Sequence, residues 1–169
     1  MTTALQPFGP TLPRSRARAL PWTTVMAGSL VSIIPVGATL PLMPPFGLLM
    51  LLAWRLLAPL ALRRWAPAVL GLFDDCLSGQ PLGSATLLWT LCFFLVDLFD
   101  QRTIFRAFAQ DWLIAAVAIT FCLVAGRLLA TPLGAHVETV LIAQIAVSIL
   151  LFPLASRVVA WVDRRRIVE

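Results

Sequence analysis

The chain has 169 residues, of which 60% are hydrophobic and 12% are charged, whereas soluble domains carry ~25% charged residues. With a mean hydropathy of +0.91, this composition excludes a soluble domain of useful size and predicts an integral membrane protein. The net charge of +5 comes from arginines without any lysine, and in so apolar a chain it favours anionic lipids over nucleic acid as the partner.

The candidate helices follow one another with short connections. Residues 1–19 are basic and rich in proline, which predicts a cytoplasmic tail, and residues 164–169 predict a basic cytoplasmic end. A membrane-spanning helix needs ~20 mostly apolar residues. Between the two ends, residues 20–163 form continuous runs rich in leucine and alanine, which favour helices over strands. We predict about six transmembrane helices, the third of them short, at 20–40, 45–62, 66–78, 82–99, 112–129 and 137–162.

The arginines predict how these helices are oriented. Loops on the cytoplasmic side of a membrane are enriched in Lys and Arg. If both ends of a six-helix chain are cytoplasmic, ten arginines fall on that side and none in the connections 39–44, 79–81 and 130–136. We therefore predict an all-α, multi-pass inner-membrane protein with an N-in/C-in topology. The ten residues are Arg14, Arg16, Arg18, Arg63, Arg64, Arg102, Arg106, Arg164, Arg165 and Arg166.

Charged residues inside the predicted helices are candidates for a site, because a charge within a membrane usually faces a partner or a cavity. Counted from the arginines at 63–64, Arg55 and Asp74 both lie roughly 12–15 Å deep at ~1.5 Å per residue. We therefore predict an ion pair between Arg55 and Asp74 or Asp75, with Asp97 near the inner end of its helix. Such a pair can fix the register of the helices or form part of an ion or substrate pathway, and the depth-matched arginine favours the structural role.

The third predicted helix ends in a run of small residues. Gly71, Asp75, Gly79 and Gly83 recur every four residues, a spacing that stacks them on one helix face and lets helices approach closely. Pro81 cannot continue a helix, so we predict an end near Gly79 and a tight turn into the fourth helix. A leucine at Gly83 should then push the third and fourth helices apart.

The run of small residues resembles the signature region of the rod shape-determining protein MreD family. Asp75, Gly79, Leu82 and Gly83 fit that signature, and residues 44–47, Pro-Pro-Phe-Gly, also look like versions of MreD. The resemblance implies a non-enzymatic inner-membrane component of the machinery that elongates the cell wall. It implies MreC, MreB and the pair of RodA and a penicillin-binding protein as partners. It also implies a fold similar to the substrate-binding components of energy-coupling-factor vitamin transporters.

The residues themselves contain no recognisable catalytic set. His136 and Glu138 are two residues apart and would not face each other on a helix. With a single histidine and three cysteines in apolar stretches, we expect no metal and no cofactor. We expect a scaffold that binds proteins through its helix faces and anionic lipids through its basic inner surface. The alternative is a small-molecule transporter or vitamin-capture component, for which Gln80 and Arg127 are among the few polar groups in the outer half.

Overall fold

The computed structural model describes residues 14–32, 43–79, 81–100, 108–130 and 138–168. Within these ranges the chain forms helices and no strand, which confirms the all-α prediction. The six helices are α1 (Arg14–Val31), α2 (Phe46–Leu57), α3 (Ala66–Ser78), α4 (Ser84–Asp100), α5 (Phe108–Ala130) and α6 (Glu138–Val168). The start of the predicted tail and most of the predicted connections at 39–44 and 130–136 lie outside the described residues, as do Arg102, Arg106 and His136.

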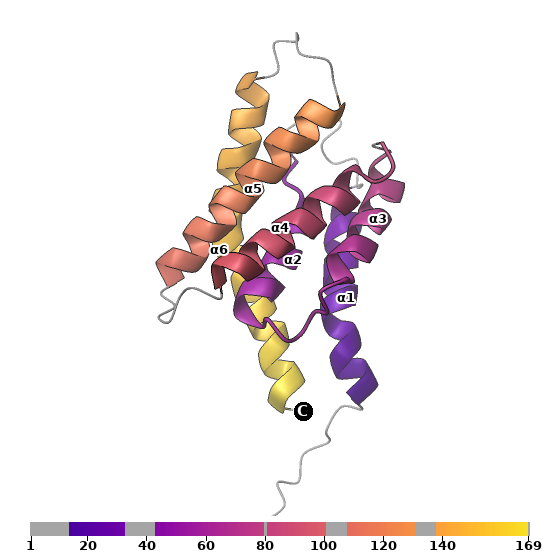
Figure 1. Ribbon diagram of the computed structural model, residues 1–169. Helices are drawn as coiled ribbons and strands as arrows, with labels where there is room; N and C mark the ends of the chain where they lie inside the picture. The colour runs from indigo at the N-terminus through magenta and orange to yellow at the C-terminus, as the bar shows by residue number, and fades with distance from the viewer. Residues whose placement is uncertain (1–13, 33–42, 80, 101–107, 131–137, 169) are drawn as a thin grey trace, which may run out of the picture.

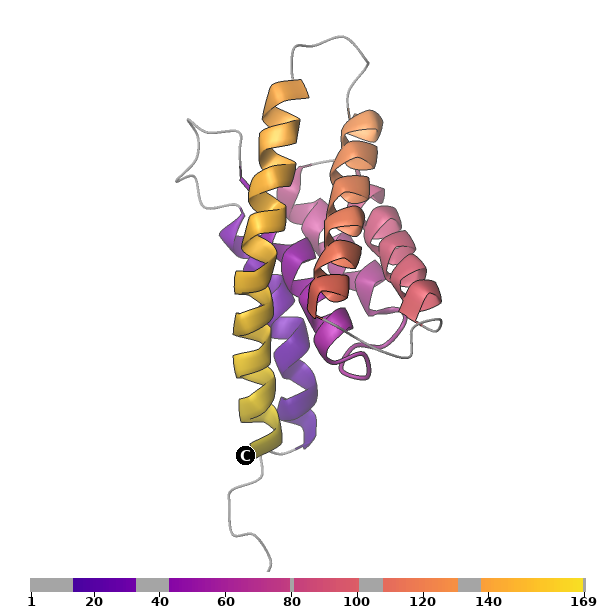
Figure 2. The same ribbon diagram turned by 90° about the vertical axis from the view of Figure 1, so that its left-hand side faces the viewer.

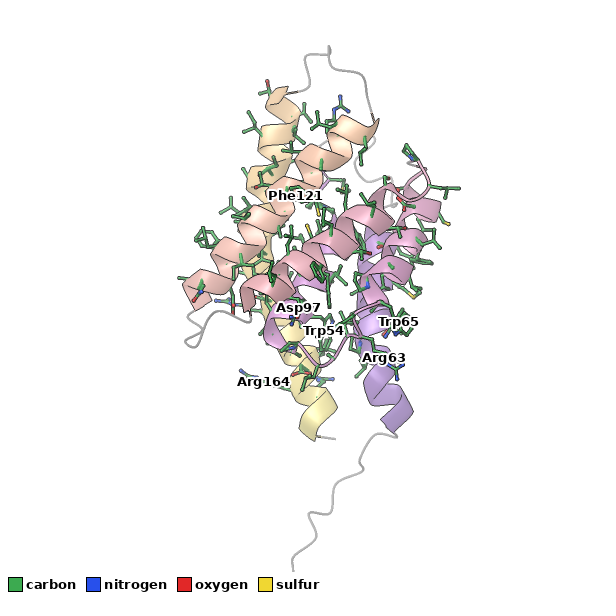
Figure 3. The ribbon with its side chains drawn as sticks, viewed as in Figure 1. Trp54, Arg63, Trp65, Asp97, Phe121 and Arg164 are labelled. Carbon is green, nitrogen blue, oxygen red and sulfur yellow. The ribbon has the colours of Figure 1, made fainter. Side chains whose placement is uncertain are left out.

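The helices run alternately up and down in a bundle (Figures 1 and 2). α1 begins and α6 ends at the same end of the molecule, where α2 also leads into α3. Arg63 and Arg164 lie towards this end, which we call the arginine end (Figure 3). The turn between α3 and α4 lies towards the opposite end. The N-in/C-in orientation relative to a membrane stays a prediction.

The short helix α2 forms the centre of the bundle. It packs against α1 and α6, and also contacts α4 and α5. Nine of its twelve residues are buried, as expected for a helix that is apolar nearly all round. Trp54, which is fully buried, donates a hydrogen bond of 2.8 Å from its indole N–H to the hydroxyl of Thr24 on α1. α2 therefore acts as the core element on which the longer helices pack.

The helices differ in length. Two of them contain a stretch long and apolar enough to cross a membrane, Ala109–Leu129 in α5 and Thr139–Arg165 in α6. At ~1.5 Å per residue, the 12 residues of α2 and the 13 of α3 extend over only about 18 and 20 Å. The hydrocarbon core of a bilayer is ~30 Å thick, so α2 and α3 are too short to span it by themselves.

The prolines explain several of the helix boundaries. α3 has the predicted bounds, with Pro67 in its first turn, where the missing N–H costs nothing. α2 was expected to reach residue 62 but ends at Leu57, because Pro59 disfavours a helical conformation at the residue before it. α1 begins at Arg14, six residues before the predicted start, and α6 continues through Pro153.

Candidate functional site

Asp75 holds the turn between α3 and α4 together. Its side chain is 1% exposed and accepts five hydrogen bonds from the start of α4. Oδ1 accepts from the backbone N–H of Ala85 at 2.8 Å and from the hydroxyl of Ser84 at 3.0 Å. Oδ2 accepts from the backbone N–H groups of Gly83 (3.0 Å) and Thr86 (3.1 Å) and from the Thr86 hydroxyl (2.9 Å). Because the first N–H groups of a helix have no partner within it, Asp75 caps α4 from the neighbouring helix.

The glycines around this carboxylate serve two different purposes. A Cβ at Gly71 would lie 2.7 Å from Cα of Thr86 and 2.9 Å from the carbonyl carbon of Ala85, so Gly71 allows α3 to approach α4 closely. Gly79 and Gly83 instead have φ angles of 66° and 98°, a left-handed conformation that favours glycine. A Cβ at Gly83 would meet no atom within 4 Å. The Cβ of a side chain there would therefore lie in open space, and the left-handed backbone conformation is the constraint that the structure shows at Gly83. That a leucine at Gly83 would push the two helices apart stays a prediction.

Pro81 completes the turn. α3 ends where the sequence predicts, with Gly79 as its C-cap. The carbonyl of Pro81 accepts a hydrogen bond of 3.1 Å from the backbone N–H of Ser84, which begins α4. The run of small residues therefore builds a tight, internally hydrogen-bonded helix hairpin.

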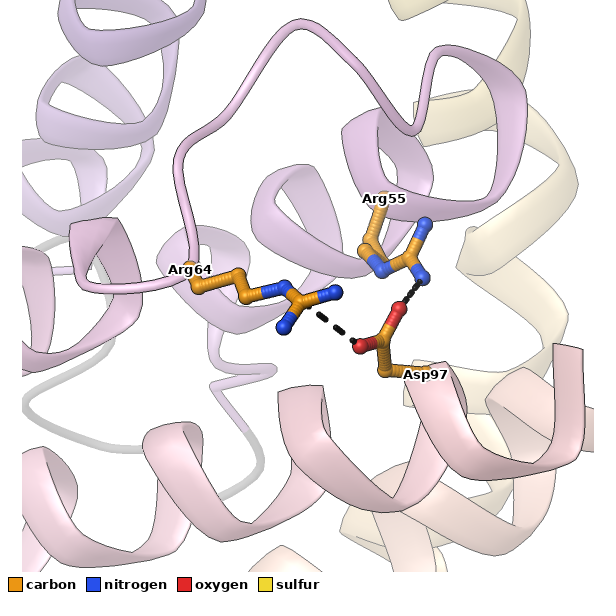
Figure 4. A network of polar contacts seen from close by, with 3 residues as sticks. All are labelled: Arg55, Arg64 and Asp97. Atoms are coloured by element: carbon orange, nitrogen blue, oxygen red, sulfur yellow. Dashed lines mark hydrogen bonds and ion pairs between the residues drawn. The ribbon is translucent and has the colours of Figure 1, made fainter. Parts of the chain in front are cut away.

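Arg55 pairs with Asp97 on α4, and not with Asp74 or Asp75 as predicted (Figure 4). The side chain of Arg55 is 4% exposed and that of Asp97 is 22% exposed. Nε of Arg64, an exposed residue, lies 3.9 Å from the second carboxylate oxygen of Asp97. A buried arginine on the central helix is thus neutralised by a carboxylate that a second arginine also approaches.

The different pairing follows from the length of α2. The helix ends at Leu57, so Arg55 lies in its last turn. A count that continues the helix to residue 62 therefore places Arg55 too far from the arginine end. Asp97 lies in the last turn of α4. The ring of Phe93, one turn before Asp97, has its centroid 5.2 Å from the guanidinium carbon of Arg55, a cation–π distance. The pair ties the central helix to α4.

Asp74 has different surroundings from its neighbour Asp75. Side chains from three other helices approach the same point on α2, Gly47. A Cβ at Gly47 would collide with Oγ of Ser29 and would lie 2.9 Å from the ring of Trp89 and 3.4 Å from Oδ1 of Asp74. Gly47 therefore leaves the space that the Ser29 and Trp89 side chains occupy, beside the Asp74 carboxylate.

Asp74 also lines a cavity of about 230 Å³ formed by residues of α2 to α6. Arg127 of α5 and Gln144 of α6 are the other charged and amide-bearing side chains in its wall. Nε2 of Gln144 donates a hydrogen bond of 2.7 Å to the backbone carbonyl of Met43. The cavity thus combines an acid, a base and an amide from three helices.

Sequence reasoning does not predict Gly47 or Gln144 as site residues. Residues far apart in the chain form the cavity, so no local spacing marks it. A polar residue on the otherwise apolar stretch of α6 is the one signal that could have indicated Gln144. Arg127 is visible in the sequence as a charge within a helix, but its relation to Asp74 is not.

A match over nearly the whole length decides the family. The family model of rod shape-determining protein MreD matches residues 16–162, from α1 to the later turns of α6. The chain belongs to the MreD family. Neither the curated proteins nor the solved structures contain a significant match, so the similarity to energy-coupling-factor components stays a prediction.

Membership in MreD gives the chain a role in rod shape determination. MreD is a membrane protein and a structural, shape-determining component that works within the MreB and MreC system. In this MreD chain, the stretch that resembles the family signature is the helix hairpin capped by Asp75. Of the signature residues, Asp75, Gly79 and Gly83 form the turn of this hairpin.

Proposed function

We propose that this MreD protein is a non-enzymatic scaffold of the cell-wall elongation complex in the bacterial inner membrane, contributing to rod shape and peptidoglycan synthesis. The family match over residues 16–162 carries the proposal. The buried charges support it, because Asp75 and the pair of Arg55 and Asp97 hold helices to one another. The proposed partners are an MreC-like protein with one membrane span, MreB, and RodA with a penicillin-binding protein.

The arginine end is proposed to face the cytoplasm. Arg63 and Arg164 lie towards this end from different parts of the chain (Figure 3). The rings of Trp22 and Trp65 lie in contact, with centroids 5.2 Å apart, and tryptophan favours the membrane interface. Each arginine near an anionic membrane surface contributes ~1 kcal/mol of attraction. The arginines and tryptophans together support contact with anionic lipids of the cytoplasmic leaflet.

The outer face of α5 is the best place for the partner's membrane helix. A groove of about 540 Å³ there is lined by apolar side chains and one threonine between residues 116 and 128. Ala116 and Thr120 are small and four residues apart, a spacing that lets a second helix approach closely. Phe121, which is 38% exposed and labelled in Figure 3, lines the same groove. Because α5 contains a full-length apolar span, a single-span partner could pack along all of it.

Affinity purification from native membranes tests the scaffold. The tagged chain would be extracted in mild detergent, and the proteins purified with it identified by mass spectrometry. We expect an MreC-like protein together with RodA and a penicillin-binding protein. Recovery of ATPase subunits with a coupling membrane protein, and none of the wall-synthesis proteins, would contradict the proposal and favour a transporter component.

Filling the groove tests the proposed face in the same purification. Ala116→Leu places a larger side chain in the groove, whereas Ala146→Leu makes the same change at an exposed alanine of α6. We expect Ala116→Leu to lower recovery of the MreC-like partner at least fivefold and Ala146→Leu to leave it unchanged. Equal recovery with both variants would exclude the outer face of α5.

A further inference from the structure

Two buried cysteines meet between α4 and α5, away from the turn and the ion pair described above. Sγ of Cys92 lies 2.9 Å from Sγ of Cys122, although the two residues are 30 positions apart in the chain. Each sulfur is also close to the backbone of the opposite helix. Sγ of Cys92 lies 3.6 Å from the carbonyl oxygen of Ala118. Sγ of Cys122 lies 3.8 Å from the carbonyl oxygen of Leu88. The proposed scaffold makes no use of these two thiols.

The distance between the two sulfurs distinguishes three roles for them. Cysteines that serve only as small apolar side chains keep ordinary contacts, which lie at ~3.5–4.0 Å even between the smaller carbon atoms. A metal ion held tetrahedrally by two thiolates would separate the sulfurs by roughly 3.8 Å, because metal–sulfur bonds are ~2.3 Å long. Within the described residues, no group of three metal-ligating side chains is present. A disulfide has an S–S bond of ~2.05 Å, so the sulfurs would approach each other by only about 0.9 Å from their 2.9 Å separation.

We propose that Cys92 and Cys122 are a redox-active pair that hydrogen peroxide converts into a disulfide between α4 and α5. The reaction proceeds through a sulfenic acid on one sulfur, and the thiol of the other residue then condenses with it. The O–O bond of the peroxide and both S–H bonds break, and one S–S bond forms. The two sulfurs together lose two electrons, the peroxide gains them, and both of its oxygens leave as water.

A cavity gives a small oxidant access to the pair. Cys122 lines the cavity of about 230 Å³ described above, and it is 6% exposed, compared with 1% for Cys92. A water molecule takes up ~30 Å³ of the liquid, and hydrogen peroxide has only one oxygen atom more, so the cavity is large enough to admit it. A charged tripeptide such as glutathione is too large to enter. Because exchange between thiols and disulfides requires access to a sulfur, the same burial should protect the disulfide from glutathione.

The disulfide would fasten the helix that carries the proposed partner groove. α5 packs on α4 and α6, and the groove on its outer face is lined by side chains between residues 116 and 128. Cys122 is not one of these lining residues, so its oxidation leaves the lining of the groove unchanged. The bond would close a loop of 30 positions and so restrict the unfolded chain. We therefore expect oxidation to stabilise the bundle without blocking the groove.

Mass spectrometry of the purified full-length protein tests the pair. Cys76→Ser removes the third, exposed cysteine and leaves Cys92 and Cys122 as the two thiols of the chain. This protein would be reduced, freed of the reductant in lipid nanodiscs, treated with hydrogen peroxide, and alkylated after denaturation. We expect an intact mass that lacks two hydrogen atoms, and a cross-linked peptide that contains both cysteines. In titrations with SDS, the unfolding equilibrium constant of the oxidised protein should be at least tenfold lower than that of the reduced protein.

A relocated pair is the matched control. Cys122→Ser combined with Thr120→Cys keeps two thiols on the same two helices but places one of them in the groove on the outer face of α5. We expect this protein to form the intramolecular disulfide at least tenfold more slowly than the original pair. Equal rates would overturn the proposal. If the relocated variant does not fold, the original pair decides, because thiols that react only after unfolding overturn the proposal as well. The assay contains no wall-synthesis protein, so its outcome is independent of the scaffold proposal.

Discussion

The cap that Asp75 provides for α4 leads to a quantitative prediction. Asp75→Asn replaces one carboxylate oxygen by an amide NH₂ group, which donates and cannot accept. Oδ1 accepts two hydrogen bonds and Oδ2 accepts three, so at least two donors at the start of α4 lose their acceptor in either orientation of the amide. Hydrogen bonds to charged groups contribute ~1.5–3 kcal/mol each. The loss of two such bonds predicts that Asp75→Asn lowers the free energy of unfolding by about 3–6 kcal/mol.

The neighbouring Asp74→Asn is the matched control for this measurement. It removes the same charge one residue away, from a side chain that lines a cavity and caps no helix. It should therefore cost at most ~1 kcal/mol, the net contribution of a typical hydrogen bond. Equilibrium unfolding in mixed micelles with increasing SDS, followed by circular dichroism, measures both variants. A difference of less than about 1 kcal/mol between them would refute the capping role of Asp75.

Two further predictions concern the contacts of α2 and α3. Asp97→Asn should lower the free energy of unfolding by ~3–5 kcal/mol in the same assay, because it removes the carboxylate that pairs with the buried Arg55. Arg55→Gln should cost less, because Asp97 is 22% exposed and Arg64 still approaches it. Replacing both Arg55 and Asp97 with leucine should restore most of the loss caused by Asp97→Asn. A double variant less stable than either single one would contradict this pairing. Gly71→Ala should lower the free energy of unfolding by ~1–3 kcal/mol, because its Cβ would overpack against the α4 backbone. In Gly126→Ala the Cβ would make an ordinary contact of 3.5 Å, so this control should leave the free energy of unfolding nearly unchanged. Equal effects of the two alanines would refute the close approach of α3 to α4.

The sequence predicts α3 and its turn well because the signals there are local. Pro67 marks the first turn of the helix, Gly79 ends it, and Pro81 prevents its continuation. The number of helices follows from the apolar runs in the same way. The end of α2 is less well predicted. The apolar residues continue past Leu57 to residue 62 and favour a longer helix, whereas Pro59 disfavours a helical conformation at residue 58. The sequence does not show which of these two effects is stronger.

The site is harder to predict, because its members come from different helices. An equal depth in the membrane predicts that Arg55 and Asp74 form an ion pair, but depth does not indicate which helices are neighbours. α2 packs in the centre, where its last turn meets Asp97 instead. The three backbone N–H groups and two hydroxyls that donate to Asp75 lie eight to eleven residues later in the chain, and only a structure shows that the hairpin brings them back to the carboxylate.

Photo-cross-linking in living cells tests the central claim, that the chain is a scaffold held to a single-span partner. A photoreactive amino acid would replace Phe121 on the outer face of α5, or Leu150, a 70% exposed residue of α6, as the control. The account predicts that a cross-link to the MreC-like protein forms from position 121 and not from position 150. A cross-link from position 150 only, or none to any wall-synthesis protein from either position in rod-shaped cells, would contradict it.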